Sequence, residues 1–194
     1  MAAESLLLNP TLPLPAGGER HAWGRLVGAS AALAATELAR RAPGPVLLLT
    51  EGPRQADQVE AEIRFFADGD LPVRHFVEWE TLPWDSFSPH QDITSERLRV
   101  LAELPRFERG IVVASVQVLL QRLPPPRYVA ARALSIRTGE QLPRDPFIES
   151  LTEAGYARVS QVAEHGEFAV RGSLIDVFPM GAVAPVRIDF FDEE

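Results

Sequence analysis

"GEFAVRGSLIDVFPMG", residues 166–181, alternates apolar and polar side chains on both sides of an Arg171–Gly172 pair. An alternation with a period of two is typical of a β-strand that has one covered face. It places Arg171 on the face opposite to that of Phe168 and Val170. We therefore predict two short antiparallel strands that expose a permanently charged guanidinium on their polar face.

The stretch "VRIDFF", residues 186–191, repeats this arrangement. Arg187 and Phe191 lie on one face of the expected strand, and its other apolar residues lie on the opposite face. Arginine combined with an aromatic residue is the composition of hot spots in protein–protein interfaces. We therefore take Arg171, Arg187 and Phe191 as candidate partner-binding residues. In the alternative interpretation, the two arginines only form ion pairs on a solvated sheet, with Glu167, Asp176 or Asp189.

The residues before 124 show a different pattern, in which short apolar runs alternate with helical spacing. "VLLLT", residues 46–50, is a continuous apolar run, which is typical of a parallel strand covered on both faces. Strands that alternate with helices indicate an α/β domain with a mostly parallel sheet. The expected order is helix 24–41, strand 46–50, helix 55–66, strand 73–77, helix 95–104, strand 110–115 and helix 116–123.

Three prolines at 124–126 interrupt this alternation, and short strands separated by Gly or Pro turns follow. We predict a domain boundary here, with an α/β domain at residues 1–132 and a smaller, mainly antiparallel α+β domain at residues 133–194. The second domain should begin with a strand near 133–137 and a helix at 145–154. Because the chain ends on "FFDEE" directly after a strand-like run, we expect this domain to be incomplete at its C-terminus.

The composition of the 194 residues excludes several kinds of chemistry. All 19 basic residues are arginine, so there is no Schiff-base or phosphate-loop lysine, and the absence of cysteine excludes disulfides and thiolate metal sites. A net charge of −8 argues against a surface that binds phosphate backbones. No apolar run reaches the roughly 18 residues that a membrane span needs. We expect a cytoplasmic chain without a membrane partner.

Three other stretches invite a chemical interpretation. "GASAALAATE", residues 28–37, has the glycine-led helix start of a phosphate-binding loop but lacks its Gly-Lys-Ser/Thr. "EHGE", residues 164–167, lacks the ligand spacing of a metal site, so we expect a solvated turn. The aromatic residues of 79–92 lie in an acidic stretch, which favours a packed loop capping the sheet over a base-stacking surface. We nominate no catalytic, cofactor-binding or metal-binding residue.

Three long segments, residues 79–98, 110–124 and 159–194, carry a resemblance to one family. "VSQVAEHGEFAVRGSLIDVFPMGAVAPVRIDFFDEE" closely resembles the UvrA-binding domain of transcription-repair coupling factors and, more loosely, that of UvrB. "WETLPWDSFSPHQDITSERL" and "GIVVASVQVLLQRLP" resemble the N-terminal module of the same factors. The resemblance covers nearly the whole chain from about Trp23, and it implies an N-terminal fragment of a much larger protein.

The resemblance implies a fold and a function for each part of the chain. Members of the family are ATP-driven DNA translocases that displace RNA polymerase stalled at lesions and recruit UvrA for nucleotide excision repair. Their N-terminal module is similar to UvrB, with a helicase-like domain of the degenerate P-loop NTPase type and a UvrA-binding domain. By motif position, the family's contacts with UvrA fall on Arg171, Arg187 and Phe191, which are the residues that the alternation also indicates.

Two departures from UvrB limit what the resemblance implies. "VGASAALAAT", residues 27–36, replaces the phosphate-binding loop, and residues 79–92 leave no room for the hairpin that clamps damaged DNA. The ATP, magnesium, double-stranded DNA and RNA polymerase of the family would then engage domains beyond residue 194. We therefore expect a non-enzymatic module that recruits UvrA. The alternative is a nucleotide- or DNA-binding helicase-like enzyme fragment.

Overall fold

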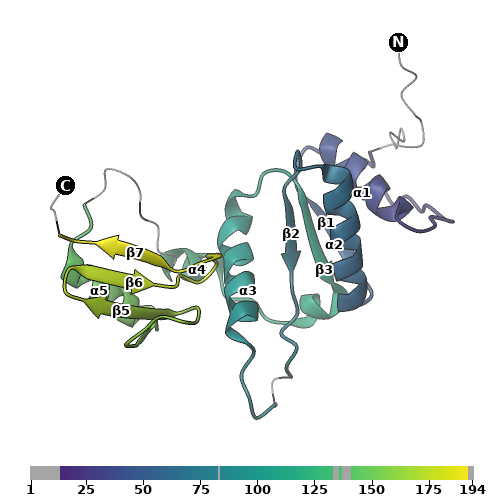
Figure 1. Ribbon diagram of the computed structural model, residues 1–194. Helices are drawn as coiled ribbons and strands as arrows, with labels where there is room; N and C mark the ends of the chain where they lie inside the picture. Colours follow the sequence, from purple (N-terminus) through teal and green to yellow (C-terminus); the bar gives the residue numbers. More distant parts are fainter. Residues whose placement is uncertain (1–13, 83, 133–135, 137–140, 192–194) are drawn as a thin grey trace. The chain divides into compact units, whose positions relative to one another are not determined.

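The computed structural model of the chain describes residues 14–82, 84–132, 136 and 141–191 (Figure 1). They fall into two units. The first unit takes the residues up to Glu78 together with Arg106–Arg122, and the second takes Trp79–Pro105 together with the residues from Leu123 onward. The predicted domain boundary divides the chain at a single point, between residues 132 and 133, whereas each unit combines two separate segments of the chain. The boundary stays a prediction.

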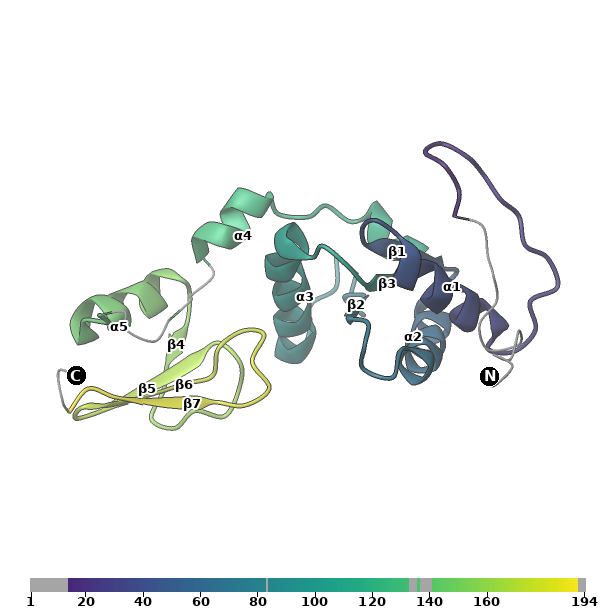
Figure 2. The same cartoon turned by 90° about the horizontal axis from the view of Figure 1, so that it is seen from above.

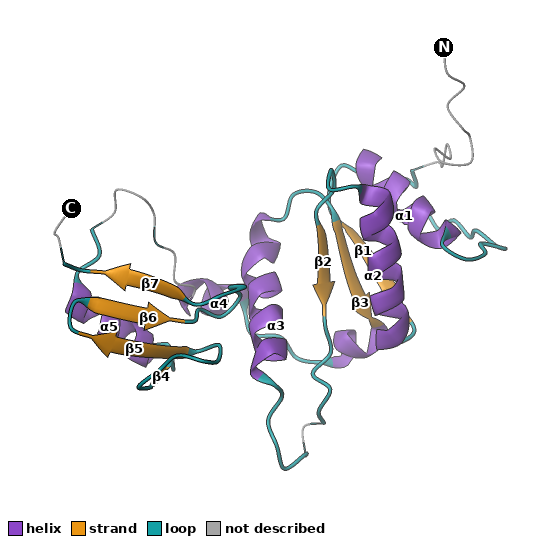
Figure 3. Ribbon diagram, in the orientation of Figure 1, coloured by secondary structure: helices purple, strands orange, loops and turns teal. Residues whose placement is uncertain are grey.

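The first unit is built on a three-stranded parallel sheet with the strand order β1-β3-β2. The central strand β3 pairs with both neighbours in a register that aligns Ile111 with Val46 and with Val73. All three arrows point the same way in Figure 3. The α/β class and the parallel sheet are therefore confirmed. The elements of this unit are α1 (Ser30–Arg41), β1 (Val46–Thr50), α2 (Pro53–Ala67), β2 (Val73–Phe76), β3 (Ile111–Ser115) and the 3-10 helix η2 (Val116–Leu120), with η1 (Leu104–Arg106) at its border.

One face of this sheet carries the core of the first unit. Helices α1 and α2 bring small alanines such as Ala39 and Ala56, and the larger Ile63, against the apolar residues of the strands. Val46 and Leu48 of β1 point into this core, whereas the alternate residues Leu47 and Leu49 are 55% and 44% exposed. The prediction that strand 46–50 is covered on both faces is therefore wrong. A continuous apolar run does not reveal how many faces are covered.

Helix α1 begins later than the predicted helix 24–41. It starts at Ser30, because Gly28 has a φ of +57°, a left-handed conformation that an α-helix does not contain. Within residues 14–29 the structure places no strand before this helix. The stretch at 28–37 therefore lacks the strand-loop-helix context that a phosphate-binding loop requires.

The loop between β2 and α3 (Gln91–Glu103) differs from its prediction as a packed loop. Trp84 is 78% exposed and Phe87 is 66% exposed. Trp79 is the aromatic residue that does pack, because the guanidinium carbon of Arg97 lies 4.2 Å from the centroid of its ring. Arg97 is 1% exposed, and this cation–π contact gives its buried charge a favourable partner.

The second unit is built on a four-stranded sheet with the strand order β4-β5-β6-β7. The β5-β6 and β6-β7 pairs are antiparallel, whereas β4 runs parallel to β5, so the sheet is mixed. Helix α4 begins at a proline within the predicted boundary region, where the fixed φ of proline suits the first turn of a helix. The predicted strand at 133–137 lies outside the described residues except for Ile136. The remaining elements are α4 (Pro126–Arg132), α5 (Arg144–Glu153), β4 (Ala157–Arg158), β5 (Glu167–Arg171), β6 (Leu174–Val177) and β7 (Val186–Asp189).

Helix α5 covers one face of this sheet. Phe147 and Leu151 of α5 pack on Phe168, Ile175 and Val177, all five at most 2% exposed. Figure 2 shows α5 on one side of the layer formed by β5, β6 and β7. Burying each of these side chains stabilises the unit by about 1.5–3 kcal/mol. The residues that alternate with them must lie on the other face of the sheet.

We predict that Gly110, at the start of β3, tolerates no side chain. Its φ is +124°, and an added Cβ would lie 2.3 Å from the Pro72 carbonyl oxygen, which accepts the Ile111 N–H at 2.9 Å. Gly110→Ala should lower the free energy of unfolding by about 3 kcal/mol or more, because backbone must move to relieve the clash. Urea unfolding of the variant measures this change.

Gly69→Ala is the matched control. Gly69 also has a positive φ, +80°, but nothing lies within 4 Å of an added Cβ. Only the backbone strain remains, so the expected loss is about 1 kcal/mol. Equal losses for the two variants would show that the contact with Pro72 does not constrain this end of the sheet.

Candidate partner-binding face

Strands β5, β6 and β7 bring their polar residues together on the face opposite to α5. The register aligns Ala169 of β5 with Asp176 of β6, and Asp176 with Arg187 of β7. Directly opposite residues in an antiparallel pair have Cβ atoms about 4.5–5.5 Å apart, so their side chains interact. We call this side of the sheet the outer face, and it consists of Arg171, Leu174, Asp176, Arg187 and Asp189, whereas Ala169 between them is 1% exposed.

Arg187 forms a two-pronged ion pair with Asp176. Its Nε donates to one carboxylate oxygen at 2.5 Å, and its Nη2 donates to the other at 2.9 Å. The Arg187 side chain remains 58% exposed, whereas that of Asp176 is 17% exposed. These hydrogen bonds, followed by the charges of Arg187 and Arg171, hold the pKa of the Asp176 carboxyl below its ordinary value. The ion pair that the alternative interpretation expects for Arg187 is therefore present in the free chain, with Asp176 as the partner.

Arg171 is exposed and is held by a backbone oxygen. Its Nη2 donates to the Ser160 carbonyl at 2.8 Å, which ties the segment after β4 to the end of β5. In the part of the chain that the structure describes, this acceptor takes the place of the carboxylate that the ion-pair interpretation expects. Gly172 follows with a φ of +63° and open space around its Cα. Among the described residues, the Arg144 guanidinium donates to the Gly172 carbonyl at 3.0 Å, and the side on which a Cβ would lie is open.

Phe191 lies just beyond β7 and is 79% exposed. Its N–H donates to a carboxylate oxygen of Asp189 at 3.0 Å, and the same oxygen accepts the Ser173 hydroxyl at 3.0 Å. Asp189 therefore fixes the turn from which the ring projects and forms no ion pair with an arginine among the described residues. The structure thus leaves all three predicted site residues exposed.

The outer face includes a shallow depression of about 470 Å³. Arginine side chains and one carboxylate border it on the sheet, and the segments at 161–162 and 185–186 add apolar edges. Such a surface offers several N–H donors and some apolar area, which suits an acidic segment of another protein. Sequence reasoning missed the lining residues outside the strands because their contact depends on the fold. The lining residues are Gln161, Val162, Arg171, Asp176, Pro185, Val186 and Arg187.

His165, in the predicted solvated turn at 164–167, is packed instead. Its side chain is 13% exposed and its ring centroid lies 4.0 Å from that of Phe178. The Nδ1 atom lies 3.0 Å from an Asp92 carboxylate oxygen, and Nε2 lies 3.0 Å from the Ala182 carbonyl oxygen. This histidine is a structural tie between α3 and the β6–β7 loop. Across the described ranges, no group of three or more His, Asp or Glu residues is placed to hold a metal ion.

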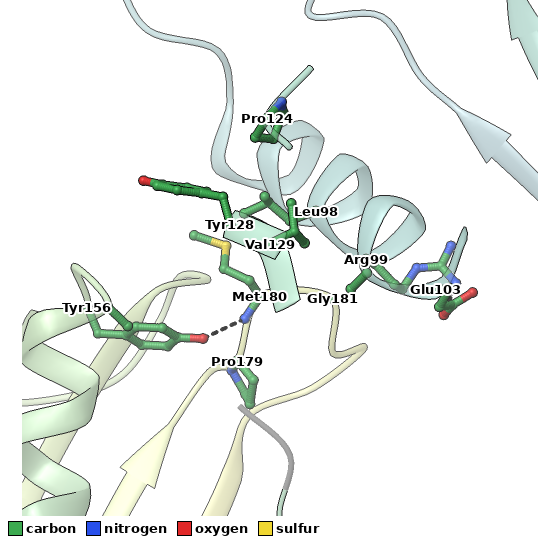
Figure 4. Close-up of a pocket in the computed structure, with 12 residues that line it drawn as sticks. Leu98, Arg99, Glu103, Pro124, Tyr128, Val129, Tyr156, Pro179, Met180 and Gly181 are labelled. Carbon is green, nitrogen blue, oxygen red and sulfur yellow. Dashed lines mark hydrogen bonds and ion pairs between the residues drawn. The ribbon is translucent and has the colours of Figure 1, made fainter. Parts of the chain in front are cut away.

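A second cavity of about 520 Å³ lies between α3, α4 and the β6–β7 loop (Figure 4). Its walls are mostly apolar, with Leu98, Val129 and Met180 among them. The Tyr156 hydroxyl accepts the Met180 N–H at 3.0 Å and so fixes the loop at one edge of the cavity. None of the described helices is long and apolar enough to cross a membrane.

We predict that the low pKa of Asp176 depends on Arg187. A lowered pKa in the folded state stabilises the fold above the pKa of the unfolded carboxyl, and this stabilisation disappears as the pH falls through the folded pKa. Arg187→Gln should raise the pKa of Asp176 towards its ordinary value, and the stability difference from the unmodified chain should shrink below about pH 4. NMR titration of the carboxyl carbons measures the pKa directly.

Glu167 is the internal control for this titration. Its pKa is lowered by the N–H groups of Ala163 and Glu164 and not by Arg187, so the substitution should leave it unchanged. An unchanged pKa of Asp176 in Arg187→Gln would show that the ion pair does not persist in solution.

The second unit, and most of the chain with it, is similar to known proteins. Residues 134–194 match the model of the UvrB interaction domain. The transcription-repair-coupling factor of Escherichia coli (strain K12) is 46% identical over 184 residues, 95% of this chain and 16% of the relative. That of Haemophilus influenzae is 38% identical over 98% of this chain and 16% of the relative. That of Mycobacterium tuberculosis is 37% identical over 92% of this chain and 15% of the relative.

The chain thus spans about one sixth of the length of these relatives. The match to the UvrB interaction domain includes β5, β6 and β7, the strands that form the outer face. The identity over nearly the whole chain shows that the first unit is related to the same proteins. The chain therefore belongs to the transcription-repair coupling factor family, to whose N-terminal region it corresponds.

Proposed function

We propose that this chain is a module that recruits UvrA by presenting the outer face and Phe191 to it. The observation that carries the proposal is the exposure of Arg171, Arg187 and Phe191 next to strands whose other face is buried. The match of residues 134–194 to the UvrB interaction domain supports it, because the family resemblance implies a UvrA-binding domain in UvrB as well. The relatives named transcription-repair-coupling factor support it too.

The two arginines have the chemistry for binding acidic groups of UvrA. A guanidinium is planar, always charged and weakly hydrated. Replacing its bound water by a partner carboxylate therefore costs less hydration free energy than it does for an ammonium. Phe191 supplies apolar area with few rotatable bonds, which is the usual property of an interface anchor. Gly172 leaves room beside Arg171 for the partner's backbone.

In the intact protein, this recruitment would serve transcription-coupled nucleotide excision repair. The family resemblance implies that motor domains elsewhere use ATP and magnesium to translocate on double-stranded DNA and to displace stalled RNA polymerase. UvrA bound to this module would then be brought to the lesion. A cytoplasmic location is the one that this role requires.

We infer that the first unit is a helicase-like domain of the degenerate P-loop NTPase type, without nucleotide binding or ATPase activity. Its parallel sheet agrees with that class of domain. The chain has no lysine to reach nucleotide phosphates, and α1 follows Gly28 and Ala29 in place of the usual phosphate loop. No contact or pocket in the described residues favours the alternative of a nucleotide- or DNA-binding enzyme fragment.

We predict that Arg171→Ala, Arg187→Ala and Phe191→Ala each weaken the binding of UvrA by about 2 kcal/mol or more, roughly thirtyfold. Arg171→Ala should change the folding free energy by no more than about 0.5 kcal/mol, because the side chain is exposed. Arg171→Lys should restore only part of the affinity, since an ammonium cannot reproduce the fork of N–H donors. Calorimetric titration of UvrA, with thermal melting of each variant, measures both quantities.

Two matched control variants lie on α2, in the first unit. Phe65 is 78% exposed, nearly as much as Phe191, and Arg54 is an exposed arginine. Phe65→Ala and Arg54→Ala should bind UvrA as tightly as the unmodified chain. Folded outer-face variants that also bind UvrA with unchanged affinity would overturn the proposed function.

A further inference from the structure

Asp176 occupies the centre of the outer face. It lies on the middle strand β6, directly opposite Arg187, and the charge of Arg171 also lowers its pKa. A carboxylate at the centre of a surface proposed to bind acidic groups requires an explanation, because like charges repel. Stability does not supply one, since Arg187 is 58% exposed and an ion pair that is open to solvent typically contributes little to folding.

The geometry of the ion pair leaves one edge of the Arg187 guanidinium available. A guanidinium has five N–H bonds, and Asp176 accepts from Nε and from one N–H of Nη2. One N–H of Nη1 and the second N–H of Nη2 form another edge that can bind a carboxylate with two parallel hydrogen bonds. In the described part of the chain, no residue accepts a hydrogen bond from this edge. A second carboxylate can therefore bind without displacing Asp176.

The ion pair also fixes the direction in which that edge points. An arginine side chain has several rotatable bonds, and ordering it on binding lowers affinity. Asp176 limits the rotation of Arg187 before any partner arrives, because two hydrogen bonds define the plane of the guanidinium. The Ser160 carbonyl restrains Arg171 in a comparable way. Both arginines are thus held by acceptors of their own domain.

We propose that Asp176 is a positioning residue for UvrA binding. It holds Arg187 so that the free edge of the guanidinium faces a carboxylate of UvrA, and in the complex Arg187 is shared by two carboxylates, one from each protein. This inference rests on the proposed function, because it requires that UvrA binds the outer face.

The charge of Asp176 and its positioning effect act on different rate constants. Removing the negative charge makes the outer face more positive, which favours the encounter with an acidic partner and does not slow association. Replacing the carboxylate by an amide leaves one acceptor oxygen in place of two, so Arg187 is less ordered in the complex, which accelerates dissociation. The two effects can therefore be separated by measuring rates instead of affinity alone.

The experiment measures association and dissociation of immobilised UvrA with four variants of the chain. Asp176→Asn should dissociate about fivefold faster than the unmodified chain, the cost of ordering one long side chain, without slower association. Asp176→Glu keeps the carboxylate and should dissociate more slowly than Asp176→Asn. In the Arg187→Ala background, Asp176→Asn should have no further effect on dissociation. Thermal melting confirms that each variant is folded.

Glu153→Gln is the charge-matched control. Glu153 is an exposed carboxylate on α5, which covers the opposite face of the sheet, so its loss should leave dissociation unchanged. If Arg187→Ala accelerates dissociation but Asp176→Asn does not, the inference is wrong and the proposed function stands. An equal effect of Asp176→Asn with and without Arg187 overturns the inference as well. If Arg187→Ala also leaves binding unchanged, the proposed function fails, and the inference fails with it.

Discussion

The packing of helix α5 on a single face of the β5-β6-β7 sheet is the constraint on which the outer face depends. Phe168, Ile175 and Val177 are at most 1% exposed, so the register of these strands cannot slip by one residue without exposing the whole core. The same alternation sends Arg171 and Arg187 to the opposite face. Burial of the core and presentation of the binding residues are therefore two results of one pattern.

The electrostatics of the outer face suit recognition better than stability. Arg187 is more than half exposed, and an ion pair that is open to solvent typically contributes little to folding. The same ion pair orders a guanidinium that still has hydrogen-bond donors available for a partner. A chain with a net charge of −8 can in this way offer two exposed guanidinium groups with a defined geometry, and it does so without becoming a general binder of polyanions.

Local patterns in the sequence were sufficient to predict β5, β6 and β7 and the face on which Arg171 and Arg187 lie, because a period of two assigns each residue to a face. They could not predict features that depend on distant parts of the chain. Periodicity did not reveal that Leu47 and Leu49 are exposed. The contact of His165 with Asp92 joins residues 73 positions apart. Which of three carboxylates pairs with Arg187 is decided by the cross-strand register. Helix α4 was missed because prolines end some helices and begin others.

If the outer face and Phe191 form the docking surface, UvrA binds next to the end of β7, and site-specific photo-crosslinking can detect it there. A benzophenone amino acid replaces Phe191 in one preparation and Phe65 in another, since the two rings are 79% and 78% exposed and lie in different units. We expect a crosslink to UvrA from position 191 and none from position 65. Equal crosslinking from both positions, or crosslinking from position 65 alone, would contradict it.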